Sequence, residues 1–251
     1  FNVDDVGYAS ASAAGLDGGS TNPTGASVNT KSKFGIYTFD GNSSNRTLSH
    51  GLGQQPDFMI VKKKSANGNS WVVWHKSIAN DKYLILNGTN SQDTDATLFN
   101  SHASDSSTLW TLGSNTSINE TGQSSVAYLW CDVPGLQKFG SYDGNNSTDG
   151  ITVELGFRPA LVWFKRTNST GNWVILDTKR TPFNPAGTSM YADSASDQDY
   201  SPGNPWADIL STGFKIRASY GEINGNSASY IYCAWAEAPA SNLFGGQSNA
   251  R

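Results

Sequence analysis

Short runs of apolar residues alternate with clusters of turn-forming residues along most of this chain. Continuous apolar runs occupy 58–61 and 161–164, and comparable runs occupy 71–74, 126–130 and 230–235. Glycine, asparagine and aspartate separate these runs. Short apolar runs bounded by turn residues are typical of β-strands that are covered on both faces. The pattern therefore predicts an all-β protein.

The same pattern occurs twice. Residues 33–135 and 138–239 form two copies of one unit of about a hundred residues. At an offset of 103, residues 40–69 and 143–172 are identical at ten of thirty positions without a gap. Both copies contain Asp-Gly-Asn, which suits a hairpin turn because glycine and asparagine adopt positive φ readily. Both then contain Gly-x-x-Pro, which leads into the strongest apolar run of the copy.

The duplication predicts the architecture. We expect two tandem, closely packed antiparallel β-sandwich repeats of jelly-roll type, at 33–137 and 138–251, since regularly spaced short strands are typical of such folds. One pseudo-symmetric sandwich built from both copies is the competing architecture. Residues 1–32 have no counterpart in the repeat and are rich in alanine, serine, glycine and threonine. We expect them to form an N-terminal arm or a linker from a preceding module.

Composition and charge narrow the classes of function. Charged residues make up 15% of the chain, below the roughly 25% of typical soluble domains. The net charge of −4 argues against nucleic acid as a partner, because nucleic-acid binding depends on a basic surface. No run of eighteen apolar residues is present, so we expect no membrane insertion. The chain starts at Phe1 without a signal-peptide pattern, and we expect it to be a portion of a longer polypeptide.

The two cysteines do not occupy equivalent positions. Cys131 aligns with Ala236, and Cys233 aligns with Tyr128. Each cysteine lies in an apolar strand near the end of its copy. We therefore expect two buried free thiols rather than a disulfide.

Catalytic signatures are absent from the sequence, which contains no nucleophile elbow, zinc-protease motif or phosphate-binding loop. The acids best placed for glycosidase chemistry are Asp132 and Glu237, at equivalent positions of the two copies. We favour ion pairs instead, with Lys62 and Lys165 as the candidate partners. The three histidines lack metal-ligand spacing and are expected to be ordinary surface or core residues: His50, His75 and His102.

One loop carries oxygen side chains at calcium-loop spacing. The residues concerned are Asp143, Asn145, Ser147, Asp149 and Glu154. The loop lacks the glycine that the calcium pattern needs at its sixth position, and strands rather than helices flank it. The matching loop of the first copy has Arg46 in place of Asp149. A hairpin turn accounts for these residues, so we expect no metal and no cofactor.

Surface recognition is the remaining candidate chemistry. Aromatic rings among asparagine, aspartate and glutamine can stack on sugar rings, and such sites usually lie on loops. The aromatic residues in polar, loop-like stretches are Trp110, Tyr200, Trp206 and Tyr220. The alternative is that these rings close the ends of the sandwich.

The longer motifs resemble a known repeat. They are K-F-G-x-Y, then D-G-N, then G-F-R-P-A-L-V-W-F-K-R-T, then G-N-W-V-I-L-D-T-K-R, and finally Y-I-Y-C-A-W-A-E-A-P. Together with the opening at 1–8 and the ending at 248–251, they are similar to repeats of virion proteins from marine tailed bacteriophages, notably cyanophages. The resemblance covers nearly the whole chain.

The resemblance implies a non-enzymatic virion structural protein, most directly a tail-fibre or appendage module exposed on the particle surface. Other virion proteins would then be its partners. Fibres are commonly trimers, so a homo-oligomer is expected by analogy. Two alternatives stay open, which are a capsid decoration protein and a lectin-like module that binds host surface glycan.

Overall fold

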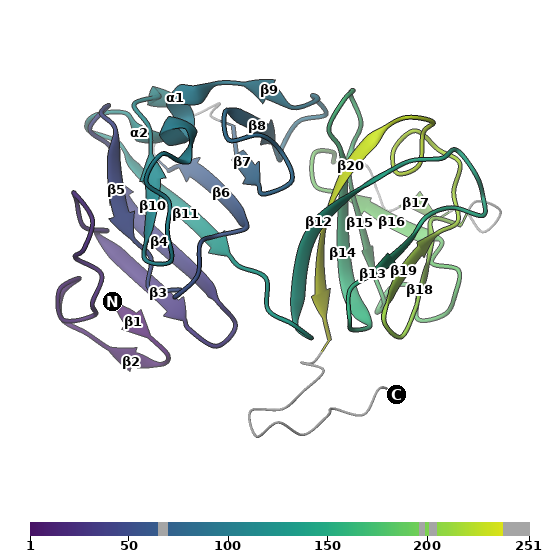
Figure 1. The fold of residues 1–251 in the computed structure, drawn as a ribbon, viewed down its shortest axis with the longest axis horizontal. Helices are drawn as coiled ribbons and strands as arrows, with labels where there is room; N and C mark the ends of the chain where they lie inside the picture. Colours follow the sequence, from purple (N-terminus) through teal and green to yellow (C-terminus); the bar gives the residue numbers. More distant parts are fainter. Residues whose placement is uncertain (65–69, 196–198, 201–204, 238–251) are drawn as a thin grey trace. The chain divides into compact units, whose positions relative to one another are not determined.

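The computed structural model describes residues 1–64, 70–195, 199–200 and 205–237. The chain divides into two compact units. Unit 1 comprises Phe1–Ile85 and Asp93–Asp132, and unit 2 comprises Leu86–Gln92 and the residues from Val133 onward. The units divide between Asp132 and Val133, five residues before the boundary expected from the repeat, and a short segment of the first copy belongs to unit 2. Both units are built from strands (Figure 1).

Unit 1 contains a large sheet, a small sheet and short helices. The large sheet has the order β2 (Val6–Gly7), β1 (Asn2–Val3), β3 (Gly25–Asn29), β4 (Phe34–Asp40), β11 (Ser124–Trp130), β6 (Phe58–Lys63), β7 (Val72–His75), β8 (Lys82–Ile85) and β9 (Asp93–Thr94). The small sheet pairs β10 (Leu109–Leu112) with β5 (Arg46–Ser49). The helices are α1 (Ala96–Phe99), the 3₁₀ turn η1 (Asn100–His102) and α2 (Thr116–Asn119).

Unit 2 repeats this plan. Its large sheet has the order β12 (Gln137–Asp143), β20 (Ser229–Ala236), β14 (Pro159–Arg166), β15 (Trp173–Asp177), β16 (Thr188–Tyr191) and β17 (Asp199–Tyr200). Its small sheet has the order β13 (Thr152–Glu154), β19 (Gly213–Ile216) and β18 (Ala207–Ile209). The order of β12 to β17 matches that of β4 to β9 in unit 1. The expectation of an all-β protein with a duplicated strand pattern is therefore confirmed.

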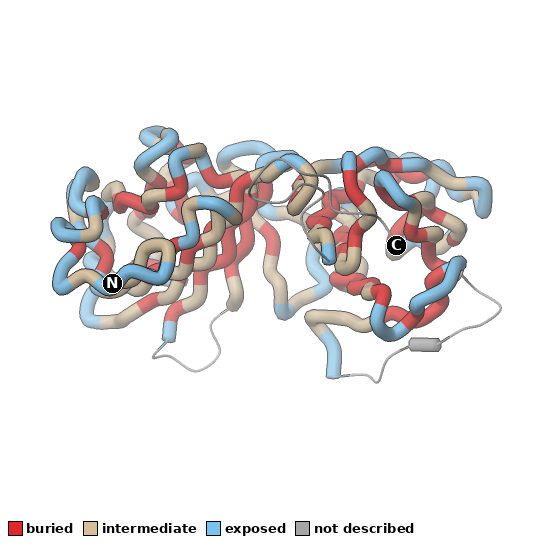
Figure 2. Tube along the Cα trace, turned by 90° about the horizontal axis from the view of Figure 1, so that it is seen from below, coloured by how far each residue is buried: buried red, intermediate tan, exposed pale blue. Residues whose placement is uncertain are grey.

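In each unit the small sheet packs on one face of the large sheet. In unit 2, the ring of Phe164 on β14 lies 5.2 Å from that of Phe214 on β19, in edge-to-face contact. In unit 1, the rings of Phe39 on β4 and Trp110 on β10 are 5.7 Å apart. Buried stretches lie in the interior of each unit and exposed stretches on its outside (Figure 2). Each unit is therefore sandwich-like, with a core of apolar and aromatic side chains between its two sheets.

Residues 1–32 do not form the separate arm that their composition suggested. Strand β3 pairs antiparallel with β4 along its whole length, and β1 adds a further strand beside β3. Leu16 and Val28 are buried at 1% and 3% exposure. The segment is therefore an edge of unit 1, because its few apolar residues are enough to fix an added strand that also satisfies the backbone of β4.

A buried asparagine closes the Asp-Gly-Asn turn in the same way in both units. In unit 2, the Asn224 amide nitrogen donates to the Asn145 side-chain oxygen at 3.0 Å and to the carbonyls of Ser147 and Ala218, each at 2.8 Å. Its side-chain oxygen accepts the backbone N–H of Asn145 at 2.9 Å. Asn224 is fully buried, so these bonds replace all its contact with water.

Asn119 makes the corresponding bonds in unit 1. Its amide nitrogen donates to the carbonyls of Ser44 at 2.9 Å and Gly113 at 2.6 Å, and its oxygen accepts the backbone N–H of Asn42 at 3.1 Å. Asn119 is also fully buried. The preceding Gly41 has no space for a side chain, since a Cβ there would lie 2.0 Å from the carbonyl oxygen of Glu120. These contacts explain why the turn recurs in the sequence.

The segment Leu86–Gln92 belongs to unit 2 through backbone bonds. The Thr89 carbonyl accepts the N–H of Gly171 at 2.9 Å, and the N–H of Gln92 donates to the Thr167 carbonyl at 2.9 Å. The ammonium group of Lys165 also donates to the Thr89 carbonyl, at 2.9 Å. Lys165 is fully buried, and this burial lowers its pKa to about 8 although the charge of Asp193 opposes the shift.

Candidate functional site

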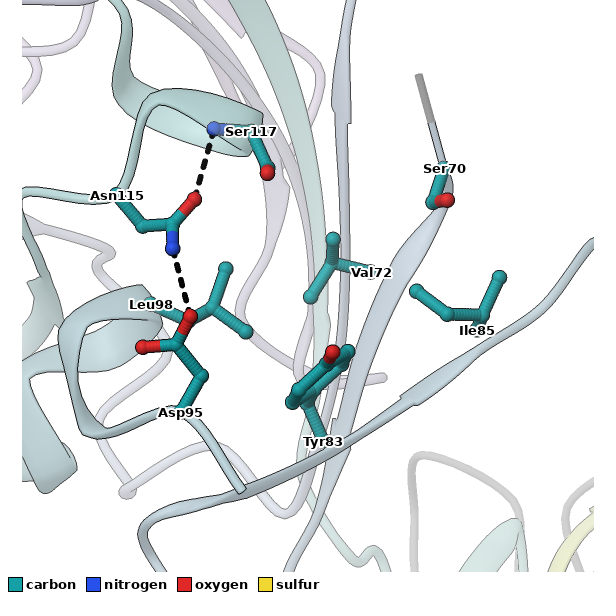
Figure 3. Close-up of a pocket in the computed structure, with 8 residues that line it drawn as sticks. All are labelled: Ser70, Val72, Tyr83, Ile85, Asp95, Leu98, Asn115 and Ser117. Carbon is teal, nitrogen blue, oxygen red and sulfur yellow. Dashed lines mark hydrogen bonds between the residues drawn. The ribbon is translucent and has the colours of Figure 1, made fainter. Parts of the chain in front are cut away.

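A cleft of about 220 Å³ opens in unit 1 beside strands β7 and β8 and the short helices α1 and α2 (Figure 3). Val72 and Leu98 contribute its apolar surface and are buried at 2% and 3% exposure. The complete lining is Ser70, Val72, Tyr83, Ile85, Asp95, Leu98, Asn115 and Ser117. These residues come from four separate segments of the chain, so the fold rather than any local motif brings them together.

The polar side of the cleft is a carboxylate beside an amide. Asp95 caps α1 by accepting the backbone N–H of Thr97 at 2.8 Å, and Asn115 caps α2 by accepting the N–H of Ser117 at 2.8 Å. The Asn115 amide also donates to the second carboxylate oxygen of Asp95 at 2.7 Å. Aspartate and asparagine are favoured at these capping positions. Because each side chain is held by its cap and by the other, both are fixed before any ligand arrives.

Tyr83 supplies the aromatic surface of the cleft. It projects from β8, and its hydroxyl donates to Asp93 at 3.5 Å. Burial raises the pKa of Tyr83, and the nearby charges of Asp93 and Asp95 raise it further. The hydroxyl is therefore neutral at physiological pH. Its hydrogen is engaged with Asp93, so the residue offers the cleft its ring.

The chemistry of the cleft follows from the charges of its lining. Asp95 is the single carboxylate of the lining, whereas glycoside hydrolysis generally uses two carboxyl groups across one cleft. The lining also includes no basic side chain. The cleft can therefore accept hydrogen bonds from an uncharged polar ligand and cover one apolar face of it.

The equivalent positions of unit 2 have different chemistry. The backbone carbonyl of Asn115 accepts the N–H of Asn119, and the backbone carbonyl of Tyr220 accepts the N–H of Asn224. Asn115 and Tyr220 therefore occupy equivalent positions. The register of β7–β8 and β15–β16 likewise makes Ser189 the counterpart of Tyr83. In place of the amide, unit 2 has the Tyr220 ring, which lies 5.5 Å from that of Trp206 and packs against the core.

The aromatic residues predicted to bind glycan are not gathered on a surface. Trp110 is fully buried and Trp206 is 4% exposed, so both pack in their cores and neither ring can stack on a sugar. Trp110 lies between the apolar residues of β10, and Trp206 directly precedes β18. Tyr220 is partly buried against the unit 2 core. Tyr200 lies in β17, and its side chain is outside the described residues.

The loop with calcium-like spacing uses its oxygen atoms in turn contacts. Asp143 accepts the Ser229 hydroxyl at 2.9 Å, Asn145 accepts the N–H of Ser147 at 3.0 Å, and Ser147 accepts the N–H of Asp149 at 3.1 Å. Asp149 pairs with Lys215. Glu154 lies on β13, which pairs with β19. Within the part of the chain that the structure describes, no three histidine, cysteine, aspartate or glutamate side chains are grouped to hold a metal ion.

The equivalent acids form ion pairs, but not with the lysines that the sequence suggested. Asp132 pairs with Lys76, which also lies 3.3 Å from Asp57. Glu237 pairs with Lys179. Lys76 follows β7 and Lys179 follows β15. The acid after β11 or β20 therefore contacts the loop after β7 or β15 of the same repeat. Lys165 was a wrong choice of partner because it is buried on a different part of the sheet and is bonded to carbonyl groups.

Both cysteines are buried and free, as expected. Burial raises the pKa of Cys131 to about 12, so its thiol stays protonated and unreactive. The histidines are core residues: His50, His75 and His102. His102 is additionally paired with Asp105 at 2.7 Å, where both side chains are almost completely buried. The His-x-x-Asp spacing on a turn was the sequence signal for this pair.

Residues 7–239 match the model of one protein family, described as a domain of unknown function (DUF7483). The chain belongs to this family. The DUF7483 match spans both repeats, so the pair of repeats rather than a single copy is the family's unit. No curated protein and no solved structure matches the chain. None of the helices in the described ranges is long and apolar enough to cross a membrane.

Proposed function

We propose that this DUF7483 chain is a non-enzymatic structural protein of a bacteriophage virion, a tail-fibre or appendage module exposed on the particle. Each repeat, in this proposal, is an antiparallel sandwich of jelly-roll type. Other virion proteins are its partners, and a homotrimer is its working assembly. The resemblance of the long sequence motifs to phage virion repeats supports the assignment to virion structural proteins.

The observation that carries the proposal is what the two repeats share. Asn119 and Asn224 each bond the Asp-Gly-Asn turn and a carbonyl six residues earlier in the chain, and both units have the same six-strand order. The chemically active residue types differ, since no histidine or cysteine has a residue of its own type at the equivalent position of the other repeat. A duplicated framework without duplicated chemistry supports a building block more than an enzyme with two active sites.

The composition supports the same role. A low content of charged residues with many polar turn residues suits an exposed particle protein, because its stability then depends little on ion pairs that salt would screen. Marine particles meet high salt.

The test is to locate the chain on purified virions. Antibody against the folded chain, detected by gold labelling in electron microscopy, is expected to mark the tail or its fibres on intact particles. The major capsid protein and a phage protein made only inside the host serve as positive and negative controls. Label on the capsid shell would support decoration instead, and absence of the chain from purified particles would overturn the virion role.

Two further measurements address the assembly and the lack of catalysis. Sedimentation equilibrium of the chain is expected to give a mass of three 26.8 kDa copies. Incubation with host polysaccharide is expected to release no fragments. Turnover that disappears in Asp132→Asn or Glu237→Gln would contradict the non-enzymatic assignment.

A further inference from the structure

We propose that the cleft of unit 1 binds a single uncharged sugar ring, held between the Asp95–Asn115 pair and the ring of Tyr83. The inference goes beyond the virion role, because a structural module needs no such site. It also replaces the aromatic residues that the sequence suggested for glycan binding, two of which are buried.

The size of the cleft limits the ligand to one ring. Its volume of about 220 Å³ is below the roughly 300–1,000 Å³ of pockets that enclose drug-sized ligands. A longer glycan could still enter by one residue, since the cleft is only partly enclosed. The site therefore selects a terminal or side-branch sugar.

The hydrogen-bonding positions that remain free on Asp95 and Asn115 are acceptors, so they favour a ligand that donates hydrogen bonds. A carboxylate accepts about four hydrogen bonds, and Asp95 uses three of these positions on the Thr97 backbone N–H, the Thr97 hydroxyl and the Asn115 amide. Both amide hydrogens of Asn115 are engaged, by Asp95 and by the Thr97 hydroxyl at 3.2 Å. What remains is one acceptor position on each of Asp95 and Asn115.

Two adjacent acceptor positions match two adjacent hydroxyl groups. The hydrogen bond from the Asn115 amide nitrogen to Asp95, 2.7 Å long, holds the two side chains beside each other, so neighbouring hydroxyls of a pyranose ring can donate to one acceptor oxygen on each. The Ser70 and Ser117 hydroxyls also line the cleft and can donate or accept. An anionic sugar would meet the Asp95 carboxylate without a basic residue in the lining, so the proposal is confined to uncharged sugars.

The apolar part of the cleft fits the C–H face of a sugar. Figure 3 shows the Asp95–Asn115 pair on one side of the cleft, Ser70 and Ile85 on the other, and Tyr83 and Val72 between them. The Tyr83 ring faces this space, so a sugar bonded to the pair would lie near the aromatic face. A few placed polar groups beside an apolar surface are typical of small-ligand sites.

The second repeat supports a specific role for these residues. At the positions of Tyr83 and Asn115 it has Ser189 and Tyr220, which separates the cleft residues from those that the framework needs. In contrast, the buried asparagines that close the turn are the same in both repeats. The cleft chemistry is therefore an addition to unit 1 rather than a requirement of the fold.

The test is saturation-transfer NMR on the whole chain with defined probes. The probes are the methyl glycosides of glucose, galactose, mannose and N-acetylglucosamine, with N-acetylneuraminic acid as the anionic sugar and calcium chloride as a cation. At the ligand efficiency of small ligands, a single ring is expected to bind with a Kd of about 1 mM. One neutral sugar should bind best, and neither the anionic sugar nor calcium should compete with it.

Variants assign the binding to the cleft. Tyr83→Ala and Asn115→Tyr are each expected to weaken binding about tenfold or more, since one removes the stacking face and the other fills the cleft with the residue found in unit 2. Tyr83→Phe keeps the ring and is expected to retain most of the affinity. Phe183→Ala is the matched control, because Phe183 is an aromatic residue of unit 2 that is 68% exposed. Melting temperatures establish that each variant is folded.

Four results would overturn the proposal. The first is no binding by any neutral probe at about fiftyfold the expected Kd. The second is binding by Tyr83→Ala and Asn115→Tyr that is as tight as binding by the native chain, and the third is loss of binding in Phe183→Ala alone. The fourth is preferred binding of calcium or of the anionic sugar. Gold labelling of virions is independent of all these outcomes, so a failure here is distinguishable from a failure of the virion role.

Discussion

Unit 1 and unit 2 have the same framework but different surfaces beside it. Both build the strand order of β4 to β9 or of β12 to β17, and both close the Asp-Gly-Asn turn with a buried asparagine. Beside the last strands, unit 1 has Tyr83 and Asn115 where unit 2 has Ser189 and Tyr220. The comparison separates the residues that the fold requires from those that are free to acquire another role.

The shared contacts are those whose loss leaves buried polar groups unsatisfied. An asparagine that bonds several carbonyls cannot be exchanged for an apolar residue without leaving them without a partner. A residue on the rim of a cleft has no such constraint, because water can replace its partners. The difference in energetic cost therefore explains the difference in what the repeats have in common.

The largest expected effect comes from removing the turn asparagines. Asn119→Ala and Asn224→Ala should each lower the free energy of unfolding by about 2–4 kcal/mol, because each leaves buried carbonyls without a donor. Hydrogen exchange followed by mass spectrometry should show faster exchange at 40–46 in the first variant and at 143–149 in the second. Each effect should stay within its own unit.

Aspartate provides the control for this pair. Asn119→Asp and Asn224→Asp keep the shape of the side chain but lose the donor, so they should destabilise nearly as much as alanine. The two turns would not be equivalent if substitution of one asparagine lowered the free energy of unfolding and substitution of the other did not.

The next effect depends on pH and is specific to unit 2. Burial lowers the pKa of Lys165 to about 8, below the roughly 10.4 of an unfolded lysine. Between these values the unfolded state holds more protons than the folded state, so stability rises as the pH increases. Relative to Lys165→Met, the free energy of unfolding of the native chain should rise by on the order of 2 kcal/mol from pH 7.5 to pH 10. Urea unfolding at both pH values measures it.

A constant difference between the native chain and Lys165→Met across this range would show that Lys165 titrates normally. The window stops at pH 10 because tyrosine ionisation in the unfolded state follows. Burial raises the pKa of Tyr142 in the folded state, which reduces stability at still higher pH.

Exchanging the cleft residues between the repeats should have unequal costs. Tyr220→Asn removes a ring that packs on Trp206 and should cost about 1–2 kcal/mol. Asn115→Tyr removes the cap of a four-residue helix and should cost about 1 kcal/mol or less. Differential scanning calorimetry should therefore record the larger decrease in Tm for Tyr220→Asn. The reverse order would mean that Asn115 serves the framework more than the cleft.

The smallest effects are expected at the equivalent acids. Asp132 pairs with the half-buried Lys76, whereas Glu237 pairs with Lys179 where both side chains are mostly exposed. Asp132→Asn should lower the free energy of unfolding by less than about 1 kcal/mol. Glu237→Gln should leave Tm unchanged within error, because water and salt screen an exposed pair. A larger effect at Glu237 than at Asp132 would reverse this difference between the units.

The strands could be predicted where their apolar residues are contiguous. The runs at 58–61 and 161–164 lie within β6 and β14. Both faces of β6 are buried over its run, whereas in β14 the buried Val162 and Phe164 alternate with the partly buried Leu161 and Trp163. Strand β3 was missed, since Gly25–Asn29 has one strongly buried side chain and its pairing depends on β4. Trp110 was misplaced because polar residues precede its strand, although three consecutive residues of β10 are buried.

The candidate site could not be predicted from spacing. Tyr83, Asp95 and Asn115 lie on a strand and at the starts of two four-residue helices, and no sequence period connects them. The buried asparagines were visible in the sequence but lie at an offset of 105, whereas the turns they close lie at 103. The second copy has two more residues between the turn and the asparagine than the first copy. A single offset therefore does not align both parts of the hydrogen-bonded network.

The crossing of Leu86–Gln92 into unit 2 makes the two domains interleaved rather than consecutive. A cut between 132 and 133 would deprive the second fragment of the Thr89 carbonyl that accepts a hydrogen bond from the ammonium group of Lys165. Such a fragment would lack part of its own unit. This connection accords with a family match that spans both repeats.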